Sequence, residues 1–538
     1  METSTLYTVM LKELVLGVPS FTLFFVVNLA CTLLVAGISL FRFLKNNYIL
    51  ARFSVCFTVF ICFFYQVPLV LFSQQLEVSL SQPWFYAAVV NGGALALSLW
   101  SIVTRRLDFR GEPSSFPEKQ ALLYLVTGLL GLASLAIYLS SVPLECTGLY
   151  ALFFDPWLTL LARELSVKLI GTSLSTYALG AYANAVAPIF ILLSVWLVRN
   201  SLLCRRFFGV LVGAVAGILA IFAVLISGTK GLLMPTMLLL VAGAYFWCKT
   251  WLSRLSTIVL AVAFLVFSLV TFELLKERGA IVGGAYDFAG CAAKTGSCQK
   301  SQDMLESMKS REQSLGLPNV YIQPLQLRLD CLCSADGDET SCPTQVLGRE
   351  GGGEVPLAEL AKQTEILIDK QAERSATFVS ALFNRMLVVP FQVSVWNFMY
   401  AESETVDGAK TLPFARRFLG ESLNMPELVY QKYGVVYSQG DKTSTSTAPT
   451  SFFLSYPAYL GWLGLLIALG AVVALDLFIA RFAYFIGASL IPLLVGSVLV
   501  LCMNFMTSDF VTVLISHGGA AGILVLSIHA LLLKKNSR

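Results

Sequence analysis

Basic side chains that could bind an anion recur in segments flanking the apolar stretches of the chain. They are Arg163, Lys230, Arg374, Arg385, Arg416 and Arg417. Guanidinium groups make paired hydrogen bonds to the oxygens of phosphate-like anions, and Lys adds a point charge. Arg374 and Arg385 are eleven residues apart, or three helical turns, so they would share one face of an unbroken helix. The set predicts a site for a multiply charged oxyanion such as a phosphate or pyrophosphate.

Carboxylates near these cations could accept a proton. Glu164 follows Arg163, and Asp155 lies earlier in the same stretch, FFDPWLTLLARELSVKL. A general base speeds the deprotonation of a hydroxyl by about 10²–10⁴-fold, and Glu164 and Asp155 are the first candidates. Asp509 and His517 are weaker candidates, because a histidine inside a membrane span more commonly makes a hydrogen bond between helices.

Simpler explanations exist for each of these residues taken alone. A single Arg can extend from an apolar segment to the membrane surface or pair with a loop carboxylate. Lys230, in the tight turn ISGTKGLLMP, could simply end a helix. Tyr456 and Tyr459 could stack on sugar rings or pack at the membrane interface, and packing is the better explanation for Trp462. The joint occurrence of the cations favours a functional site, since charges close to hydrocarbon are costly.

The composition shows what must position these residues. Of 538 residues, 57% are hydrophobic and only 13% are charged, and the mean hydropathy is +0.75. Soluble domains carry about 25% charged residues. The chain is therefore predicted to be an all-α integral membrane protein.

Apolar stretches of about 20 residues are long enough to cross a bilayer. They predict eleven spans, at residues 14–41, 49–73, 84–103, 121–140, 176–198, 207–227, 231–248, 255–275, 452–475, 482–503 and 511–533. The first eight form an N-terminal bundle over residues 1–275, and the last three a C-terminal bundle over 452–538. Residues 276–451 form one long segment between them.

Lys and Arg set the orientation, because they collect in the cytoplasmic connections. The richer side holds Arg42, Lys45, Arg52, Arg105, Arg106, Arg110, Lys119, Arg199, Arg205, Arg206, Lys249, Arg254, Arg481, Lys534, Lys535 and Arg538. The short connections of the other side hold Lys12, Arg163, Lys168 and Lys230. The first side is predicted to be cytoplasmic, with the N-terminus outside and the C-terminus inside.

The apolar stretch LFNRMLVVPFQVSVWNFMY, residues 382–400, is a special case. If it crossed the membrane, every later segment would invert, and Arg481 and the basic C-terminus would face outward. We therefore expect residues 376–400 to form a re-entrant or amphipathic helix at the outer leaflet, with Arg385 at the outer face. A twelfth span with an Arg extending to the surface is the alternative.

Half of the twelve cysteines lie on the predicted outer side. They are Cys146, Cys291, Cys298, Cys331, Cys333 and Cys342. An even number in an oxidising compartment predicts disulfides, whose connectivity the sequence leaves open. Zinc is the alternative, but no His lies nearby and the spacing fits no common site. We expect disulfides that make a rigid lid in the 276–451 segment.

The sequence lacks the motifs that are typical of several classes of enzyme. There is no Walker motif, no dinucleotide-binding glycine pattern and no HExxH. The predicted cytoplasmic connections are short, so no nucleotide-sugar domain is expected there. The energy for any reaction must come with the substrate or from an ion gradient.

Four stretches together resemble the Wzy-type polysaccharide (O-antigen) polymerases, which join lipid-linked oligosaccharide repeat units. The stretches are ARELSVKLIGTSLSTYALGAYANAVAPIFILLS, ISGTKGLLMPTMLLLVAGAYF, LFNRMLVVPFQVSVWNFMY and STAPTSFFLSYPAYLGWLG. They cover roughly a fifth of the chain. The cysteine-rich segment between Cys291 and Cys342 departs from the family pattern.

The resemblance implies a metal-independent glycosyltransferase of the GT-C type, without a cofactor, in the bacterial inner membrane. Donor and acceptor would be glycans on undecaprenyl pyrophosphate, with a chain-length regulator as a possible partner and no nucleic acid. Arg163, Lys230 and Arg385 match the family's basic positions and would hold the pyrophosphate. Arg374, Arg416 and Arg417 would support them.

Three other functions remain open at this stage. An O-antigen ligase-like enzyme would use the same donor with a different acceptor. A transporter or flippase of lipid-linked glycans would show internal repeats and broken helices near the midplane. A scaffold with a disulfide-bonded outer domain would not need a basic cluster.

Overall fold

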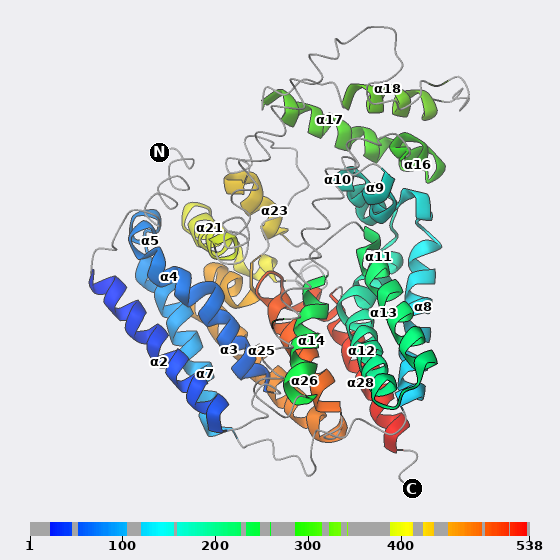
Figure 1. Cartoon of the computed structure of the whole chain (residues 1–538). Helices are drawn as coiled ribbons and strands as arrows, with labels where there is room; N and C mark the ends of the chain where they lie inside the picture. The colour runs from blue at the N-terminus through cyan, green and yellow to red at the C-terminus, as the bar shows by residue number, and fades with distance from the viewer. Residues whose placement is uncertain are drawn as a thin grey trace.

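The computed structural model describes residues 22–45, 52–104, 120–154, 159–227, 233–247, 259, 286–314, 322–334, 342, 388–412, 423–434, 450–486, 490–515 and 517–534. Every regular element within these ranges is a helix (Figure 1). The predicted all-α class is confirmed for this part of the chain.

Eight helices in the described ranges are long and apolar enough to cross a membrane, and they coincide with eight of the predicted spans. The elements are α2 (Leu23–Lys45), α3–η2–α4 (Phe53–Leu71), α6–η3–α7 (Pro83–Val103), α8 (Gln120–Leu139), α11–η7–α12 (Ser173–Leu203), α13–η8 (Phe207–Ser227), α25 (Phe452–Ile486) and the pair α27 (Phe510–Ile515) and α28 (Gly519–Lys534). The chain is thus a polytopic membrane protein.

Two more predicted spans correspond to shorter helices. These are α14 (Leu233–Trp247) and α26 (Ile491–Phe505), of 15 residues each. They pack closely, since a Cβ on Gly496 of α26 would touch the Cα of Leu239 in α14 at 3.0 Å. The predicted span 255–275 lies outside the described residues.

The end of α25 differs from the prediction. The apolar run was expected to stop at residue 475, with a loop before a span beginning at 482. Instead α25 continues through Asp476 and Arg481 to Ile486, and α26 begins at Ile491. A charge in a hydropathy profile suggests a loop, but Asp476 is fully buried inside the bundle beside Arg52.

A break divides α25 near its start. Gly461 has φ 60° and ψ −140°, a conformation that is accessible almost only to glycine. Gly464 lies against the carbonyl of Tyr456, where any side chain would collide. The Gly-x-x-Gly pattern thus separates a short first segment, from Phe452, from the long span that follows.

Glycines also permit the close packing of α12 (Ala187–Leu203) and α13. Gly209, Gly213 and Gly217 face α12 at four-residue intervals. A Cβ on Gly213 would lie 2.9 Å from a methyl of Val198 and 3.1 Å from the carbonyl of Ser194. Small residues at this spacing let membrane helices approach each other closely.

Three helices, α16 (Phe288–Lys294), α17 (Cys298–Ser314) and α18 (Ile322–Leu332), form a layer at one end of the bundle, which we call the cap (Figure 1). The cap rests on α9 (Gly148–Phe154), α10 (Thr159–Glu164) and the π-helix η6 (Leu165–Leu169). The C-terminal end of α28 lies at the opposite end of the bundle, which we call the far end.

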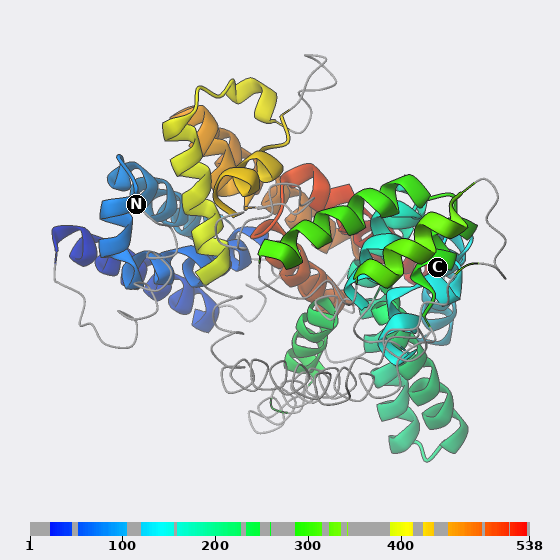
Figure 2. The same ribbon diagram turned by 90° about the horizontal axis from the view of Figure 1, so that it is seen from above.

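The 276–451 segment contributes a second layer at the cap end. It consists of α21 (Val389–Ser403), η11 (Gly408–Thr411), α23 (Met425–Val429) and the π-helix η12 (Tyr430–Gly434), next to α5 (Ser73–Ser79). Seen from above, the cap lies over the side of the bundle that contains α8–α10, whereas α21 lies between α5–α7 and α25 (Figure 2).

Candidate functional site

Four of the predicted site residues lie in the described part of the chain. Arg163 and Glu164 are on α10, and Tyr456 and Tyr459 are on the first segment of α25. The other predicted residues, Asp155, Lys230, Arg374, Arg385, Arg416 and Arg417, lie outside the described residues. Lys168 belongs to η6.

Arg163 lies on α10 at the cap end, on a face of the helix that the described part of the protein does not cover. The Arg163 side chain is exposed and that of Glu164 is half-buried. Leu161, Ala162 and Leu165 are at most 5% exposed and join the same apolar cluster as the cap residues. Because one face of the helix is held by this cluster, the position of Arg163 is set by packing.

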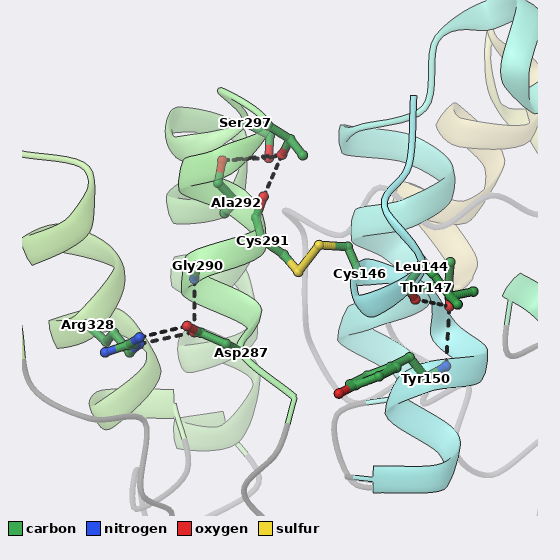
Figure 3. The surroundings of a disulfide bond; sticks show 11 residues. Leu144, Cys146, Thr147, Tyr150, Asp287, Gly290, Cys291, Ala292, Ser297 and Arg328 are labelled. Carbon is green, nitrogen blue, oxygen red and sulfur yellow. Dashed lines mark hydrogen bonds and ion pairs between the residues drawn. A yellow bond between two sulfur atoms is a disulfide. The ribbon is translucent and has the colours of Figure 1, made fainter. Parts of the chain in front are cut away.

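Three disulfides secure the cap. Cys298 pairs with Cys333, and Cys331 pairs with Cys342. The third bridge joins Cys146, in the short helix η4 (Leu144–Cys146) before α9, to Cys291 of α16 across 145 residues of sequence (Figure 3). The predicted use of all six outer cysteines in disulfides is confirmed.

An ion pair supports the same corner of the cap. Arg328 donates from Nε to Asp287 Oδ1 at 3.1 Å and from Nη2 to Oδ2 at 2.7 Å (Figure 3). Asp287 also accepts from the backbone N–H of Gly290 at 2.9 Å and so caps α16. Burial alone would raise the pKa of Asp287, but the hydrogen bonds and the positive charges of Arg328 and Lys294 outweigh it and lower that pKa.

The layer around α21 is also tightly packed. Residues 390–398 of α21 are all buried, so both faces of this part of the helix contact protein. Its Ser394 hydroxyl lies 2.6 Å from the hydroxyl of Tyr86 in α6. Glu402 accepts from the backbone N–H groups of Ser81 and Gln82, at 3.0 and 3.1 Å, just before α6 begins. Helix α21 is not among the candidate spans, and residues 382–387 lie outside the described part.

The aromatic residues at the start of α25 take different environments. Tyr456 is 6% exposed and packs on Phe452. Tyr459 is partly buried and donates from its hydroxyl to Asn397 Oδ1 at 2.6 Å. Trp462 is 58% exposed, with its ring edge-on to Phe85. Contact of Tyr456 or Tyr459 with a sugar stays a prediction.

A charged and aromatic cluster lies beside Tyr459. Lys432 contacts the carboxylate of Glu404 at 2.5 Å and donates to the hydroxyl of Ser403 at 2.7 Å. Its ammonium group lies 5.3 and 5.7 Å from the ring centres of Tyr400 and Tyr433. The hydrogen bond to Glu404 raises the pKa of Lys432, so this cation stays charged.

The weaker base candidates have structural partners. Asp509 accepts from the backbone N–H groups of Val511 and Thr512, each at 3.0 Å, at the start of α27. His517 Nε2 lies 3.1 Å from the hydroxyl of Ser508. His529 is fully buried, and its Nε2 lies 2.9 Å from the hydroxyl of Thr127.

The sequence did not predict that two charged residues pair inside the bundle. Arg52 and Asp476 form an ion pair, and Asp476 also accepts from Ser54 N at 3.0 Å and Trp100 Nε1 at 3.1 Å. A lone Asp within a long apolar helix was the available signal, because such residues are rare and normally paired.

Three buried carboxamide side chains are joined in a row by hydrogen bonds. Gln66 Nε2 donates to Asn91 Oδ1 at 2.8 Å, and Asn91 Nδ2 donates to Asn28 Oδ1 at 2.6 Å. Gln66 and Asn91 each lie in a π-helical turn, η2 (Cys62–Gln66) and η3 (Ala88–Gly92). Single amides in apolar runs have no diagnostic spacing, so the sequence did not indicate this connection.

Comparison with known proteins adds nothing to these observations. No protein-family model, no curated protein and no solved structure matches the chain.

Proposed function

We propose that the protein is a membrane glycosyltransferase that polymerises undecaprenyl-pyrophosphate-linked oligosaccharide repeat units into surface polysaccharide. The proposal rests on the resemblance of the four sequence stretches and on the polytopic helical fold. The observation that carries it is the placement of Arg163. This cation is exposed at the cap end of the bundle, on a helix whose other face is buried against a disulfide-linked cap.

The reaction follows from the chemistry of the leaving group. A hydroxyl of the acceptor glycan attacks the sugar carbon that carries the pyrophosphate of the donor. A new C–O bond forms, the bond to pyrophosphate oxygen breaks with its electron pair, and the hydroxyl proton passes to a base. Pyrophosphate leaves readily, so the protein mainly has to position the reactants and stabilise the departing negative charge.

Each predicted residue has a role in this scheme. Arg163, Lys230 and Arg385 bind the pyrophosphate, with Arg374, Arg416 and Arg417 in support. Glu164 or Asp155 takes the proton. Arg163 and Glu164 are neighbours on α10, so the same helix supplies a cation for the leaving group and a carboxylate for the proton.

The location follows from the charges and the disulfides. We place the chain in the bacterial inner membrane with the cap in the periplasm, the N-terminus periplasmic and the C-terminus cytoplasmic. Two features support this orientation: the three disulfides lie at the cap end, where an oxidising compartment is required, and α28 ends at the far end.

The test is reconstitution of the purified protein with lipid-linked repeat units. We expect a ladder of products, with an Arg163→Ala variant slower by about 10²–10³-fold because a stabilising charge is lost. Arg163→Lys should restore only part of the activity, since Lys lacks the paired donors of Arg. Arg206→Ala is the matched control, because Arg206 is an exposed Arg at the start of α13.

The remaining outcomes distinguish the other functions. Transfer of one glycan to a different acceptor without a ladder would indicate a ligase. Movement of intact lipid-linked glycan across the bilayer, without a new bond, would indicate a transporter. A ladder that forms equally well with Arg163→Ala would refute the role given to that residue.

A further inference from the structure

A small intramembrane cavity lies between helices of the two bundles. It is bordered by η7 (Tyr182–Val186), α25, α26 and α28, and its volume is about 40 Å³. Most of its described wall is apolar, but the described part also includes four polar side chains: Asn184, Ser497, Asn504 and His517. None of the roles proposed above explains why these groups meet inside the membrane.

Two irregular pieces of backbone meet at this cavity. Asn184 belongs to the π-helical turn η7, and such turns are frequent at functional sites. On the other side the helix is interrupted between α27 and α28, where Gly518 has φ +75°. A Cβ on Gly518 would lie 3.2 Å from the Cα of Ala181, so the interruption packs directly against the helix that contains η7. Irregular backbone at membrane depth is tolerated where protein buries it or where it lines a water-filled cavity.

Asn504 provides the second, independent observation. Its Nδ2 is buried and has no hydrogen-bond partner among the residues that the structure describes. A buried amide donor without a partner destabilises the fold, and more so in a membrane interior, where no bulk water can reach it. His517 and Asn184, which also line the cavity, carry further polar atoms.

The size of the cavity identifies the ligand. One water needs about 10–15 Å³ of cavity volume and two to four polar partners, so the space suits about three or four waters. It is far too small for a sugar or a pyrophosphate group. We propose that this cavity is an intramembrane water site, in which Asn504 binds water molecules that also contact His517 and Asn184.

The two histidines of the chain should then differ in their contact with water. His517 lines the cavity. His529 lies further along α28, is fully buried and contacts Thr127 of α8. Water at the site would give His517 a means of exchanging protons that His529 lacks. This inference does not depend on the proposed glycosyl transfer.

Deuterium exchange at the imidazole C2 position, measured by mass spectrometry, tests the proposal on the full-length protein in nanodiscs. We expect His517 to exchange about tenfold faster than His529, as locally hydrated groups exchange ahead of protected ones. Equal protection of the two rings would overturn the proposal.

Two substitutions at one position complete the test. Asn504→Leu replaces the amide by two methyl groups in nearly the same shape. It therefore removes the donor and makes this part of the wall apolar, so exchange at His517 should slow by about tenfold. Asn504→Ala leaves room for water, so exchange should stay as fast as in the unmodified protein or become faster. Unfolding would accelerate exchange at His529 as well, which identifies a misfolded variant. An unchanged rate at His517 in folded Asn504→Leu would also overturn the proposal.

Discussion

Arg52 and Asp476, which are 424 positions apart in the chain, form a buried ion pair with 2.8 Å between Nη2 and Oδ2. The Arg52 side chain is 7% exposed and that of Asp476 is not exposed at all. Asp476 also accepts hydrogen bonds from Ser54 and Trp100. The pair thus joins α25 of the C-terminal bundle to α3 and α7 of the N-terminal bundle.

Breaking this pair should destabilise the fold strongly. We expect Arg52→Met to cost about 3–5 kcal/mol, because it leaves the Asp476 carboxylate buried without its counter-charge. Thermal unfolding of the protein in detergent would measure the loss. The double variant Arg52→Met/Asp476→Leu should recover much of it, since an apolar pair replaces both charges. A double variant as unstable as Arg52→Met would contradict this explanation.

The interruption of α25 should depend on one glycine. Gly461→Ala is expected to cost about 1–3 kcal/mol, because Ala is strained at φ 60° and ψ −140°. Gly470→Ala is the matched control within the same helix. A Cβ there meets no atom within 4 Å, and replacing a helical Gly by Ala stabilises by about 0.5–1 kcal/mol. Equal effects of the two changes on the unfolding temperature would show that the break is not needed.

The bridge between Cys146 and Cys291 should contribute more than a local bridge. Replacing both cysteines by Ser opens a loop of 145 residues, and loss of such a bridge typically costs about 2–4 kcal/mol. Opening the bridge between Cys331 and Cys342, which spans 11 residues, should cost about 2 kcal/mol less by loop entropy. Protease cleavage within the cap, followed over time, would rank the two variants. The reverse order would contradict a role in fixing the cap to the bundle.

The cap should become less stable in acid because of Asp287. The pKa of Asp287 is lower in the folded protein than in the unfolded chain, where it is about 3.9. Its stabilising contribution is therefore complete above the unfolded value and is lost as the pH falls through the folded value.

Asp287→Asn tests this dependence. The amide oxygen can still accept from Gly290 but carries no charge for Arg328. We expect the variant to unfold at a lower temperature than the unmodified protein at pH 7, with the difference shrinking near pH 3. A constant difference across this range would exclude the ion pair as its cause.

The sequence predicted the membrane part well, because an apolar run of sufficient length has few alternatives. It misplaced the end of α25, since Asp476 lowers the local hydropathy and only its distant partner Arg52 keeps the residue inside the bundle. The disulfide partners could not be predicted either. Cys331 and Cys333 are separated by one residue yet belong to different bridges.

The candidate site was less accessible to sequence reasoning. Spacing places Glu164 next to Arg163 on one helix, but it says nothing about what covers the other face of that helix. The burial of Leu161 and Leu165 beneath the cap depends on residues more than a hundred positions later, such as Phe288 and Leu329. Long-range contacts of this kind leave no local pattern.

That shared cluster has a consequence for how the protein is made. Residues 159–169 are synthesised long before Phe288 and Leu329, yet their apolar face is completed only by those later residues. Cys146 likewise waits for Cys291. During translation this face must stay exposed or be shielded by a chaperone until the cap residues have been made and have folded onto it. Truncation before residue 286 would therefore leave the N-terminal half as a substrate for quality-control proteases.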